Sequence, residues 1–433
     1  MLHTNLSVNE QGHLTIAGVD SVYLAEKYGT PVYLLDEDRV RERARTYVTA
    51  MRQYFGEHSR PLFASKALSF RGIYKIAAEE GMCVDIVSSG ELYTALSAGF
   101  PAKDMYFHGN NKTDADIEYA IECGIGTFIV DNFEELQAIE ACAARHGIRQ
   151  EVLLRVTPGI DPHTYAAVNT GKVDCQFGIS IETGQAAAFV GEILKCAHVN
   201  LRGFHCHIGS QIFDQIPFCD AADIMIRFIA DMKAAYGYEA EVLNLGGGFG
   251  VRYVESDPEI DIAENIRLVA EHVAARCTEF GVPYPVILME PGRSIVADAG
   301  VTLYTVGSVK TIEGYRSYVS IDGGMSDNPR YALYGSEYTV HVANRMNEPA
   351  DFLCSVAGRC CETGALIQEN VTLPRPQRGD ILAVLVTGAY NYSMASNYNR
   401  ICRPPIVLLS GGKDRLAVRR ETFADLTACE LDI

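Results

Sequence analysis

The sequence alternates regularly between short apolar runs and amphipathic stretches from about residue 60 to about residue 290. The apolar runs have the length of buried strands, and the stretches between them, such as 70–78, 91–98 and 134–139, have the spacing of helices. Eight strands that alternate with helices over roughly 230 residues predict a (β/α)8 TIM barrel. The eight runs end near Ser65, Val87, His108, Val130, Val156, His207, Leu245 and Glu290.

A doubly wound open sheet is the competing arrangement for the same pattern. The first strand-to-helix turn, after Ser65, lacks the glycine fingerprint with which such a sheet binds a dinucleotide. The barrel is therefore the expected fold of this part of the chain.

Beyond about residue 300 the helical period fades, and the chain reads as strands separated by Gly, Asp and Asn turns. We expect a separate C-terminal β-rich domain, completed by the N-terminal segment, in which Tyr33-Leu34-Leu35 reads as a strand. The predicted domains are a barrel over 36–296 and a β-rich domain made of 1–35 and 297–433. The expected C-terminal strands are 301–306, 318–321, 381–386 and 405–409.

The composition narrows the class of partner. An apolar fraction of 48% and a charged fraction of 21% are those of an ordinary soluble globular protein. The 55 acidic residues outnumber the 37 basic ones and give a net charge of −18, which argues against a nucleic acid or an anionic membrane as partner. The first residues have no signal-peptide pattern, and no apolar run has the length of a membrane span. Thirteen scattered cysteines indicate reduced thiols, so we expect a cytoplasmic protein.

Polar residues gather at the predicted strand ends, where a barrel places its chemistry. Taken singly, each has a structural explanation. Together they form a ring of one lysine, two histidines, an arginine, carboxylates and a glycine turn around one opening. The members are Lys66, Asp85, His108, Asp131, Arg155, His207, Gly246 to Gly248 and Glu290.

The lysine and the glycines of this ring each have two interpretations. Lys66 can be a fixed cation or an amine that attacks a carbonyl, although a lysine that merely extends from a strand end into solvent is commoner. The backbone N–H groups of Gly246, Gly247 and Gly248 can converge on a phosphate group. Three glycines can also form an ordinary turn.

Two further motifs indicate a cofactor. His205 and His207 alternate along a strand and would share a face as metal ligands, but no acidic or thiol partner follows at ligand spacing, so no metal is predicted. A histidine ring that stacks on a planar cofactor, with Ser210 on a phosphate, suits the glycines better. Glu290 can hold a heteroaromatic nitrogen protonated, and Arg293 can hold a phosphate or carboxylate in a bidentate fork. These groups together describe pyridoxal 5′-phosphate.

From Pro31 to Pro405 the sequence resembles the fold-type III pyridoxal-phosphate decarboxylases. The common form in that family has Ala-Asn after the lysine, whereas here Ala67 is followed by Leu68, a departure that leaves Lys66 intact. The motifs that carry the resemblance are FASKA (63–67), VDIVSSGEL (84–92), HCHIGSQ (205–211), GGGFG (246–250), EPGR (290–293), MSDNPRY (325–331), CETG (361–364) and GAY (388–390).

The resemblance implies a role for each matching residue. Lys66 would carry the cofactor, His207 would stack on its ring, and Glu290 would keep the ring nitrogen protonated. Cys361 would return a proton to the substrate carbon, with Lys66 and His207 as the other catalytic residues, while the adjacent Cys360 would be a structural or bystander residue. The further cofactor-binding positions are Asp85, Ser210, Gly246, Gly247, Gly248, Gly292, Arg293 and Tyr390. The substrate-binding positions are Arg293, Arg330, Tyr334, Glu362 and Tyr390.

Within the family, the resemblance is to the branch that decarboxylates meso-2,6-diaminopimelate to L-lysine and CO2, the last step of lysine biosynthesis. A substrate with an amino and a carboxyl group at its far end needs an anion and a cation together, which Glu362 and Arg330 would supply. An ornithine-type decarboxylase needs only the anion, and an arginine there would repel its diamine end. Alanine racemases share the barrel but use a tyrosine opposite the lysine and lack the Cys-Glu motif.

Two alternatives remain open from the sequence. One is a related decarboxylase that acts on carboxynorspermidine or arginine, and the other is a non-catalytic pyridoxal-phosphate-binding protein. The resemblance also implies a two-fold homodimer in which each β-rich domain completes the active site of the partner. The expected partners are thus an amino-acid substrate and a second copy of the chain, with no nucleic acid and no membrane.

Overall fold

The predicted strands form a closed parallel barrel. In the computed structural model, which describes residues 1–160 and 174–432, the strands lie in the order β9-β11-β12-β13-β5-β6-β7-β8, and β8 pairs with β9 to close the ring. This closure excludes the doubly wound open sheet. A short strand, β10 (Ile179–Ser180), extends the pairing of β9. The barrel strands are β5 (Arg60–Ala64), β6 (Cys83–Ile86), β7 (Met105–Phe107), β8 (Thr127–Val130), β9 (Gln150–Thr157), β11 (Val199–His205), β12 (Val242–Asn244) and β13 (Val286–Met289).

Apolar side chains from different strands pack together in the core of the barrel. Leu62, Ile129, Leu153 and Leu288, which come from β5, β8, β9 and β13, belong to one buried cluster. Burial of each such side chain stabilises the fold by about 1.5–3 kcal/mol relative to its exposure. Because side chains fill a barrel of this kind, polar chemistry is confined to the strand ends.

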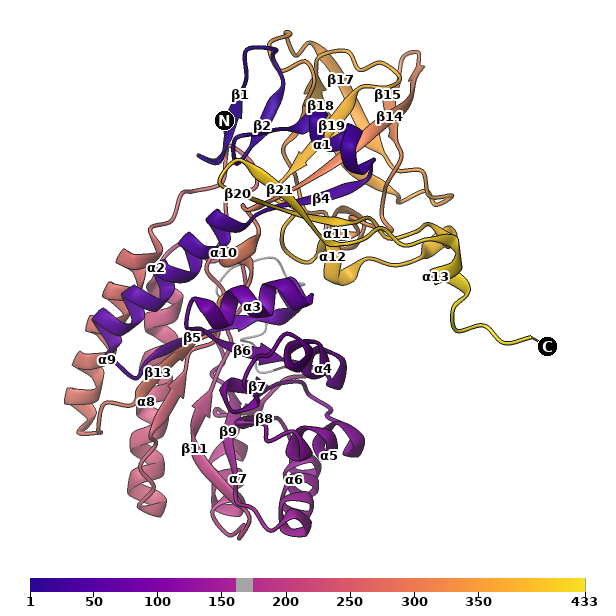
Figure 1. The fold of residues 1–433 in the computed structure, drawn as a ribbon. Helices are drawn as coiled ribbons and strands as arrows, with labels where there is room; N and C mark the ends of the chain where they lie inside the picture. The colour runs from indigo at the N-terminus through magenta and orange to yellow at the C-terminus, as the bar shows by residue number, and fades with distance from the viewer. Residues whose placement is uncertain (161–173, 433) are drawn as a thin grey trace. The chain divides into compact units, whose positions relative to one another are not determined.

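Helices follow the strands, as the sequence pattern predicts, and in Figure 1 they lie around the barrel. The helix expected around 91–98 begins where Ser88 accepts a hydrogen bond from the backbone N–H of Glu91. The helix expected around 134–139 begins after Asn132 and ends at Gly147, whose left-handed conformation closes the last turn. The helices that follow barrel strands are α3 (Arg71–Glu79), α4 (Ser89–Ser97), α5 (Asp114–Glu122), α6 (Phe133–His146), α7 (Gln185–Ile193), α8 (Ile216–Tyr236) and α9 (Ile262–Phe280).

A mixed sheet forms the β-rich part of the chain, and the N-terminal segment completes it as predicted. The N-terminal strand β4 (Val32–Asp36) lies between β14 (Gly300–Ile312), to which it is antiparallel, and β20 (Ile406–Ser410), to which it is parallel. All four predicted C-terminal strands are present. The other strands of this sheet are β15 (Arg316–Ile321), β16 (Val340–Val342), β17 (Phe352–Ala357), β18 (Leu366–Leu373), β19 (Ile381–Leu385) and β21 (Lys413–Val418).

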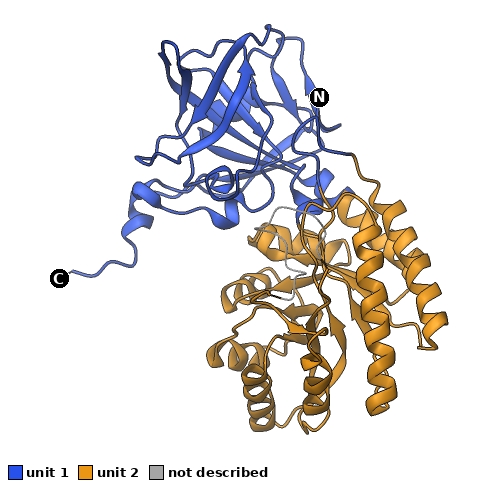
Figure 2. Ribbon diagram, turned by 180° about the vertical axis from the view of Figure 1, so that it is seen from behind, with its two compact units in different colours: residues 1–42, 251–258, 293–433 blue, residues 43–250, 259–292 orange. Residues whose placement is uncertain are grey.

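The chain divides into two compact units, coloured separately in Figure 2. Unit 2 contains the barrel and consists of 43–250 and 259–292, and unit 1 contains the mixed sheet. Unit 1 consists of 1–42, 251–258 and 293–433, so a short segment that follows the glycine turn belongs to the β-rich unit. The sequence pattern did not predict this excursion. The functional domain boundaries after residues 35 and 296 stay a prediction.

The structure gives the state of the cysteines and the length and apolar character of the helices. All thirteen cysteines lie in the described part of the chain, and no disulfide joins them. Among the described helices, none combines the length and the apolar character needed to cross a membrane.

Candidate active site

Lys66 lies at the end of β5, in a single 3-10 turn (η1, Ser65–Ala67) that immediately follows the strand. Its side chain is exposed, and it forms no hydrogen bond or ion pair with the described residues. The backbone around it is tightly packed. A Cβ atom added to Gly292 would lie 2.9 Å from the Cβ of Ala64 and 3.1 Å from that of Ala67, and the N–H of Ala64 donates to the carbonyl of Pro291. The turn that carries Lys66 and the turn after Glu290 are therefore held against each other.

Glu290 is the centre of a buried polar cluster at the same end of the barrel. Its Oε1 lies 2.9 Å from His108 Nε2, and its Oε2 lies 3.1 Å from His205 Nε2. Asn244 Nδ2 donates to Oε1 at 2.7 Å. The strand register brings these groups to one level, because His205 is paired with Asn244 and Asn244 with Leu288, two residues before Glu290.

The cluster keeps Glu290 ionised. Burial opposes ionisation, but the neighbouring His108 and His205 hold the pKa of Glu290 well below its usual value. Burial lowers the pKa of His205 to about 4 in spite of Glu290, so this ring is neutral near pH 7 and can donate its Nε2 proton. Burial also raises the pKa of Asp85, which lies 4.0 Å from His108 on the neighbouring strand. A buried anion thus stands at the opening where Lys66 lies.

The two histidines considered as a metal pair have different partners. β11 ends at His205, and His207 lies beyond it, where its Nδ1 accepts a hydrogen bond from Gly247 N–H at 3.3 Å. His108, His205 and Glu290 have ligand-type atoms within 4.8 Å of one another, but the contacts of 2.9 and 3.1 Å have hydrogen-bond lengths. Burial and the positive charges of Lys66 and Arg155 lower the pKa of His207 well below its usual value. His207 is therefore a neutral ring at the barrel opening.

The three glycines after β12 are required by close packing. An added Cβ would lie 2.1 Å from the carbonyl oxygen of Glu290 at Gly247, and 2.7 Å from that of Gly209 at Gly248. Gly246 has a φ of +70°, which side chains rarely adopt. Two N–H groups of this turn are engaged within the protein, since Gly246 donates to Asn244 Oδ1 at 2.9 Å and Gly247 donates to His207. Their predicted role toward a phosphate group stays a prediction, as does that of Ser210.

The predicted arginines of unit 1 gather around Tyr253 and Tyr390. The guanidinium groups of Arg293 and Arg330 lie 4.9 and 5.6 Å from the ring centroid of Tyr390. Both donate to the hydroxyl of Tyr253, at 2.9 and 3.2 Å. Tyr390 has a φ of +66°, a strained conformation for a tyrosine and of the kind that functional sites retain. Guanidinium groups of this kind can bind a carboxylate or phosphate group, and the predicted binding roles of Arg293 and Arg330 stay a prediction.

The predicted Cys361 and Glu362 are exposed and are held by one turn of unit 1. The N–H of Cys361 donates to Asn399 Oδ1 at 2.8 Å, and the hydroxyl of Tyr398 donates to Glu362 at 3.2 Å. The adjacent Cys360 is buried. Tyr334, another predicted substrate residue, ends α11 (Arg330–Tyr334) and is 43% exposed.

Sequence reasoning missed several residues that the structure brings into these clusters. His205 was considered only as a metal ligand, and Asn244 was not considered. Both are polar residues at the last position of an apolar strand, which is a signal that the sequence did contain. Tyr253 and Tyr338, which contact Arg330, had no comparable signal.

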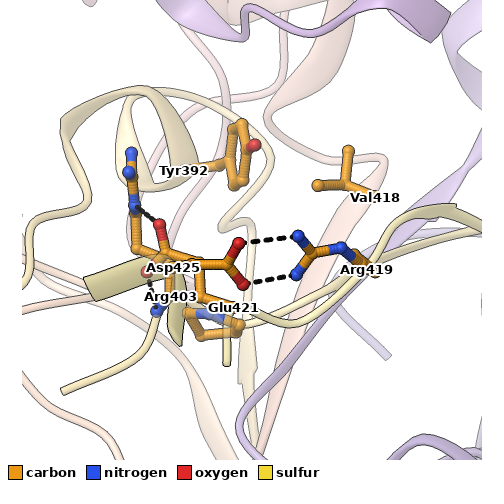
Figure 3. A pocket seen from close by; sticks show the side chains of 7 residues that line it. Tyr392, Arg403, Val418, Arg419, Glu421 and Asp425 are labelled. Carbon is orange, nitrogen blue, oxygen red and sulfur yellow. Dashed lines mark hydrogen bonds and ion pairs between the residues drawn. The ribbon is translucent and has the colours of Figure 1, made fainter. Parts of the chain in front are cut away.

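A separate pocket of unit 1, with a volume of about 320 Å³, contains none of the predicted residues. Its charged side chains are paired with one another, as Figure 3 shows. Arg419 donates to both oxygens of Asp425 at 2.6 and 2.7 Å, and Arg403 donates to Glu421 at 2.7 Å. These pairs leave little net charge to attract a ligand.

Comparison with known proteins agrees with the barrel fold. Residues 37–297 match the family model described as pyridoxal-dependent decarboxylase, pyridoxal binding domain. The chain therefore belongs to the pyridoxal-dependent decarboxylases.

Full-length relatives place the chain more narrowly. It is 45% identical to a diaminopimelate decarboxylase of Bacillus subtilis, over 99% of this chain and 98% of that protein. Two solved structures of diaminopimelate decarboxylases, each in complex with L-lysine, are also similar. The one from M. jannaschii has a TM-score of 0.91 and 33% identity over 100% of this chain and 99% of that one. The one from Helicobacter pylori has a TM-score of 0.86 and 30% identity over 95% and 99%. Within its class, the chain belongs to the diaminopimelate decarboxylase family.

Proposed function

We propose that this protein decarboxylates meso-2,6-diaminopimelate to L-lysine and CO2, the last step of lysine biosynthesis, as a cytoplasmic homodimer that uses pyridoxal 5′-phosphate. The observation that carries the proposal is the pair of buried arginines, Arg293 and Arg330, in a chain whose barrel presents Lys66 and an ionised Glu290. Full-length similarity to diaminopimelate decarboxylases supports the same substrate. Residues 36–296 would be the cofactor-binding domain.

The residues of the barrel opening fit pyridoxal phosphate. Lys66 is an exposed amine without a carboxylate partner among the described residues, and His207 is a neutral ring that can lie against a planar group. Glu290 is a buried anion that can accept a hydrogen bond from a protonated ring nitrogen. Ser210, Gly292, Arg293 and Tyr390, with the turn at Gly246, Gly247 and Gly248, would hold the phosphate, and Asp85 would complete the binding set.

When bound, pyridoxal phosphate supplies an electron sink for the charge left on the α-carbon after CO2 departs. The protein contributes position and proton control. Lys66 would hold the cofactor covalently between turnovers, and Glu290 would keep the proton on the ring nitrogen. Cys361 would deliver a proton to the α-carbon, with its backbone oriented through Asn399.

The far end of the substrate would be recognised by opposite charges. Arg293 and Arg330 would bind the distal carboxylate, with Tyr334 and Tyr390 beside it, and Glu362 would bind the distal ammonium group. Ornithine and arginine have no distal carboxylate that could bind to the two buried guanidinium groups. This chemistry favours meso-diaminopimelate over those substrates.

The test is a CO2-release assay on a panel of amino acids. We expect turnover of meso-diaminopimelate to exceed that of ornithine, arginine and carboxynorspermidine. Glu362→Gln should raise KM and lower kcat/KM for meso-diaminopimelate by on the order of 100-fold, because it removes a charged partner. Glu348→Gln, at an exposed position that pairs with Arg345, is the matched control. Faster turnover of another amino acid in the panel would reject the proposed substrate, and the absence of turnover of all of them would favour a non-catalytic protein.

A further inference from the structure

Tyr253 lies between the two buried arginines of unit 1. Its hydroxyl oxygen accepts hydrogen bonds from Nη1 of Arg293 at 2.9 Å and from Nη1 of Arg330 at 3.2 Å. The same two guanidinium groups lie 5.7 and 5.5 Å from the centroid of its ring. One phenol group thus contacts both cations through its oxygen and its ring.

The arrangement needs compensation, because like charges repel strongly where water is excluded. Arg293, Arg330 and Tyr253 are each only 5% exposed. Within the described residues, Arg330 forms no ion pair with a carboxylate, and its side-chain hydrogen bonds go to the hydroxyls of Tyr253 and Tyr338. The phenol oxygen of Tyr253 therefore supplies negative potential to both cations.

Tyr253 is itself held in place. The ring of Tyr338 packs edge-on against it with centroids 5.6 Å apart, and Thr339 Oγ1 donates to its backbone carbonyl at 2.9 Å. A fixed oxygen that accepts from two guanidinium groups sets their separation and directs their other N–H groups. Burial opposes ionisation of Tyr253, but the charges of Arg293 and Arg330 lower its pKa below the ordinary value.

We propose that Tyr253 is a positioning residue that aligns Arg293 and Arg330 into one receptor for the distal carboxylate of the substrate. The identity of that substrate rests on the function proposed above. The inference predicts selectivity: Tyr253 should matter for ligands with a carboxylate at the far end, which include meso-diaminopimelate and the product L-lysine, and not for cadaverine, which has no carboxylate.

The first experiment compares Tyr253→Phe with the wild-type protein. The variant keeps the ring and removes the acceptor oxygen, so KM for meso-diaminopimelate should rise roughly tenfold while kcat changes little. The inhibition constant of cadaverine, which has no carboxylate, should stay unchanged. Tyr238→Phe, which removes a hydroxyl that donates to the backbone carbonyl of Leu201, is the matched control. An equal loss of affinity for both ligands, or a loss confined to kcat, would overturn the inference.

A second measurement needs no variant. Pimelate, a dicarboxylate that cannot be decarboxylated by this chemistry, would add negative charge beside Tyr253 and should shift its ionisation to higher pH. Among the described residues, Arg293 and Arg330 donate to the Tyr253 hydroxyl, and the ring of Tyr338 packs against that of Tyr253. In a spectrophotometric pH titration, tyrosinate absorbance should therefore appear at higher pH when pimelate is bound and should not move to higher pH when cadaverine is bound. Binding of pimelate without this change would contradict the inference.

The two proposals can fail separately. If the wild-type protein does not turn over meso-diaminopimelate, the proposed function is wrong, and the pimelate measurement still decides the role of Tyr253. If turnover is normal and pimelate and cadaverine behave alike, the role of Tyr253 is wrong and the proposed function stands.

Discussion

Glu290 shows how its neighbours give one side chain its chemistry. A carboxyl group with 8% exposure would normally resist ionisation, but contacts from His108, His205 and Asn244 stabilise the anion. Lys66 is the opposite case, an exposed amine to which the described residues offer no hydrogen bond or ion pair. A cofactor with an aldehyde group and a ring nitrogen needs an amine for the aldehyde and an ionised hydrogen-bond acceptor for the nitrogen. Lys66 and Glu290 offer these two groups at one opening of the barrel.

Covalent trapping tests the assignment of Lys66. Borohydride reduction of the purified protein should abolish its visible absorbance and attach the cofactor to Lys66, as peptide mapping would show. Lys112 should stay unlabelled, because it is buried and donates to Glu135 at 2.8 Å and to two backbone carbonyls. Lys66→Arg should lose both the absorbance and the label. A label on Lys75 or Lys112 would reject the assignment of the whole site.

The burial of Asp327 leads to a prediction of how the free energy of unfolding depends on pH. Burial raises its pKa to about 7, although Tyr304, Gly324 and Ser326 donate hydrogen bonds to it. Because an unfolded aspartate titrates near about 4, the native state binds more protons between those values, and this group lowers the free energy of unfolding as pH rises from about 4 to 7.

Asp327→Asn mimics the protonated acid and should flatten that decline. Thermal unfolding across this range should show the variant gaining stability relative to wild type as pH rises, by a few kcal/mol at most. Asp351→Asn, at an exposed position, is the control. An unchanged pH profile in Asp327→Asn would contradict the assignment.

Strand register and close-packed turns assemble the barrel site. The parallel pairing of β11, β12 and β13 brings the polar groups at their ends to one level. The glycine turn after β12 lies directly against the backbone of Glu290 and Gly209. The positions of Glu290 and His207 therefore depend on this turn as much as on their own strands.

Gly247→Ala tests that dependence. The new Cβ would lie 2.1 Å from the Glu290 carbonyl oxygen, so the backbone must shift. We expect a loss of more than about 2 kcal/mol in the free energy of unfolding, together with weaker retention of the cofactor. Gly307→Ala, where the nearest atom would be 3.7 Å away, should change neither quantity appreciably. Normal stability and cofactor content in Gly247→Ala would show that the turn tolerates displacement.

The two units divide the predicted residues between them. Lys66, His207 and Glu290 belong to unit 2, whereas Cys361 and Glu362 belong to unit 1. The function proposed above would need residues of both units. The resemblance implies that a homodimer supplies them by an isologous arrangement, in which each chain completes the site of its partner.

Mixing of inactive variants tests the shared site. Lys66→Ala and Cys361→Ala should each be nearly inactive alone. When they are co-refolded in equal amounts, a shared site leaves one intact site in each heterodimer, so about a quarter of wild-type activity should return. A site built within one chain would carry a lesion in every copy. Activity near zero, with heterodimers demonstrated by differential tagging, would exclude the shared site.

Much of the architecture could be predicted from the sequence because it depends on local properties. Strand length, helical period and turn residues are encoded within a few positions, and they sufficed for the eight barrel strands, for β4 as a strand and for the β-rich C-terminal part. The polar residues at the strand ends followed from the geometry of a barrel. Specific motifs then carried the family resemblance, which the comparisons confirm.

The contacts that tune the site depend on the tertiary structure. His205 reaches Glu290 across 85 residues of sequence, and Arg330 reaches Tyr253 across 77. Strand register and side-chain packing determine such contacts, and neither leaves a periodic signal in the chain. The segment 251–258 follows the glycine turn of the barrel and yet belongs to unit 1, which brings Tyr253 to the arginines. Local pattern thus predicted which elements form, whereas the burial, charge and hydrogen bonding of each functional group were decided by segments distant in sequence.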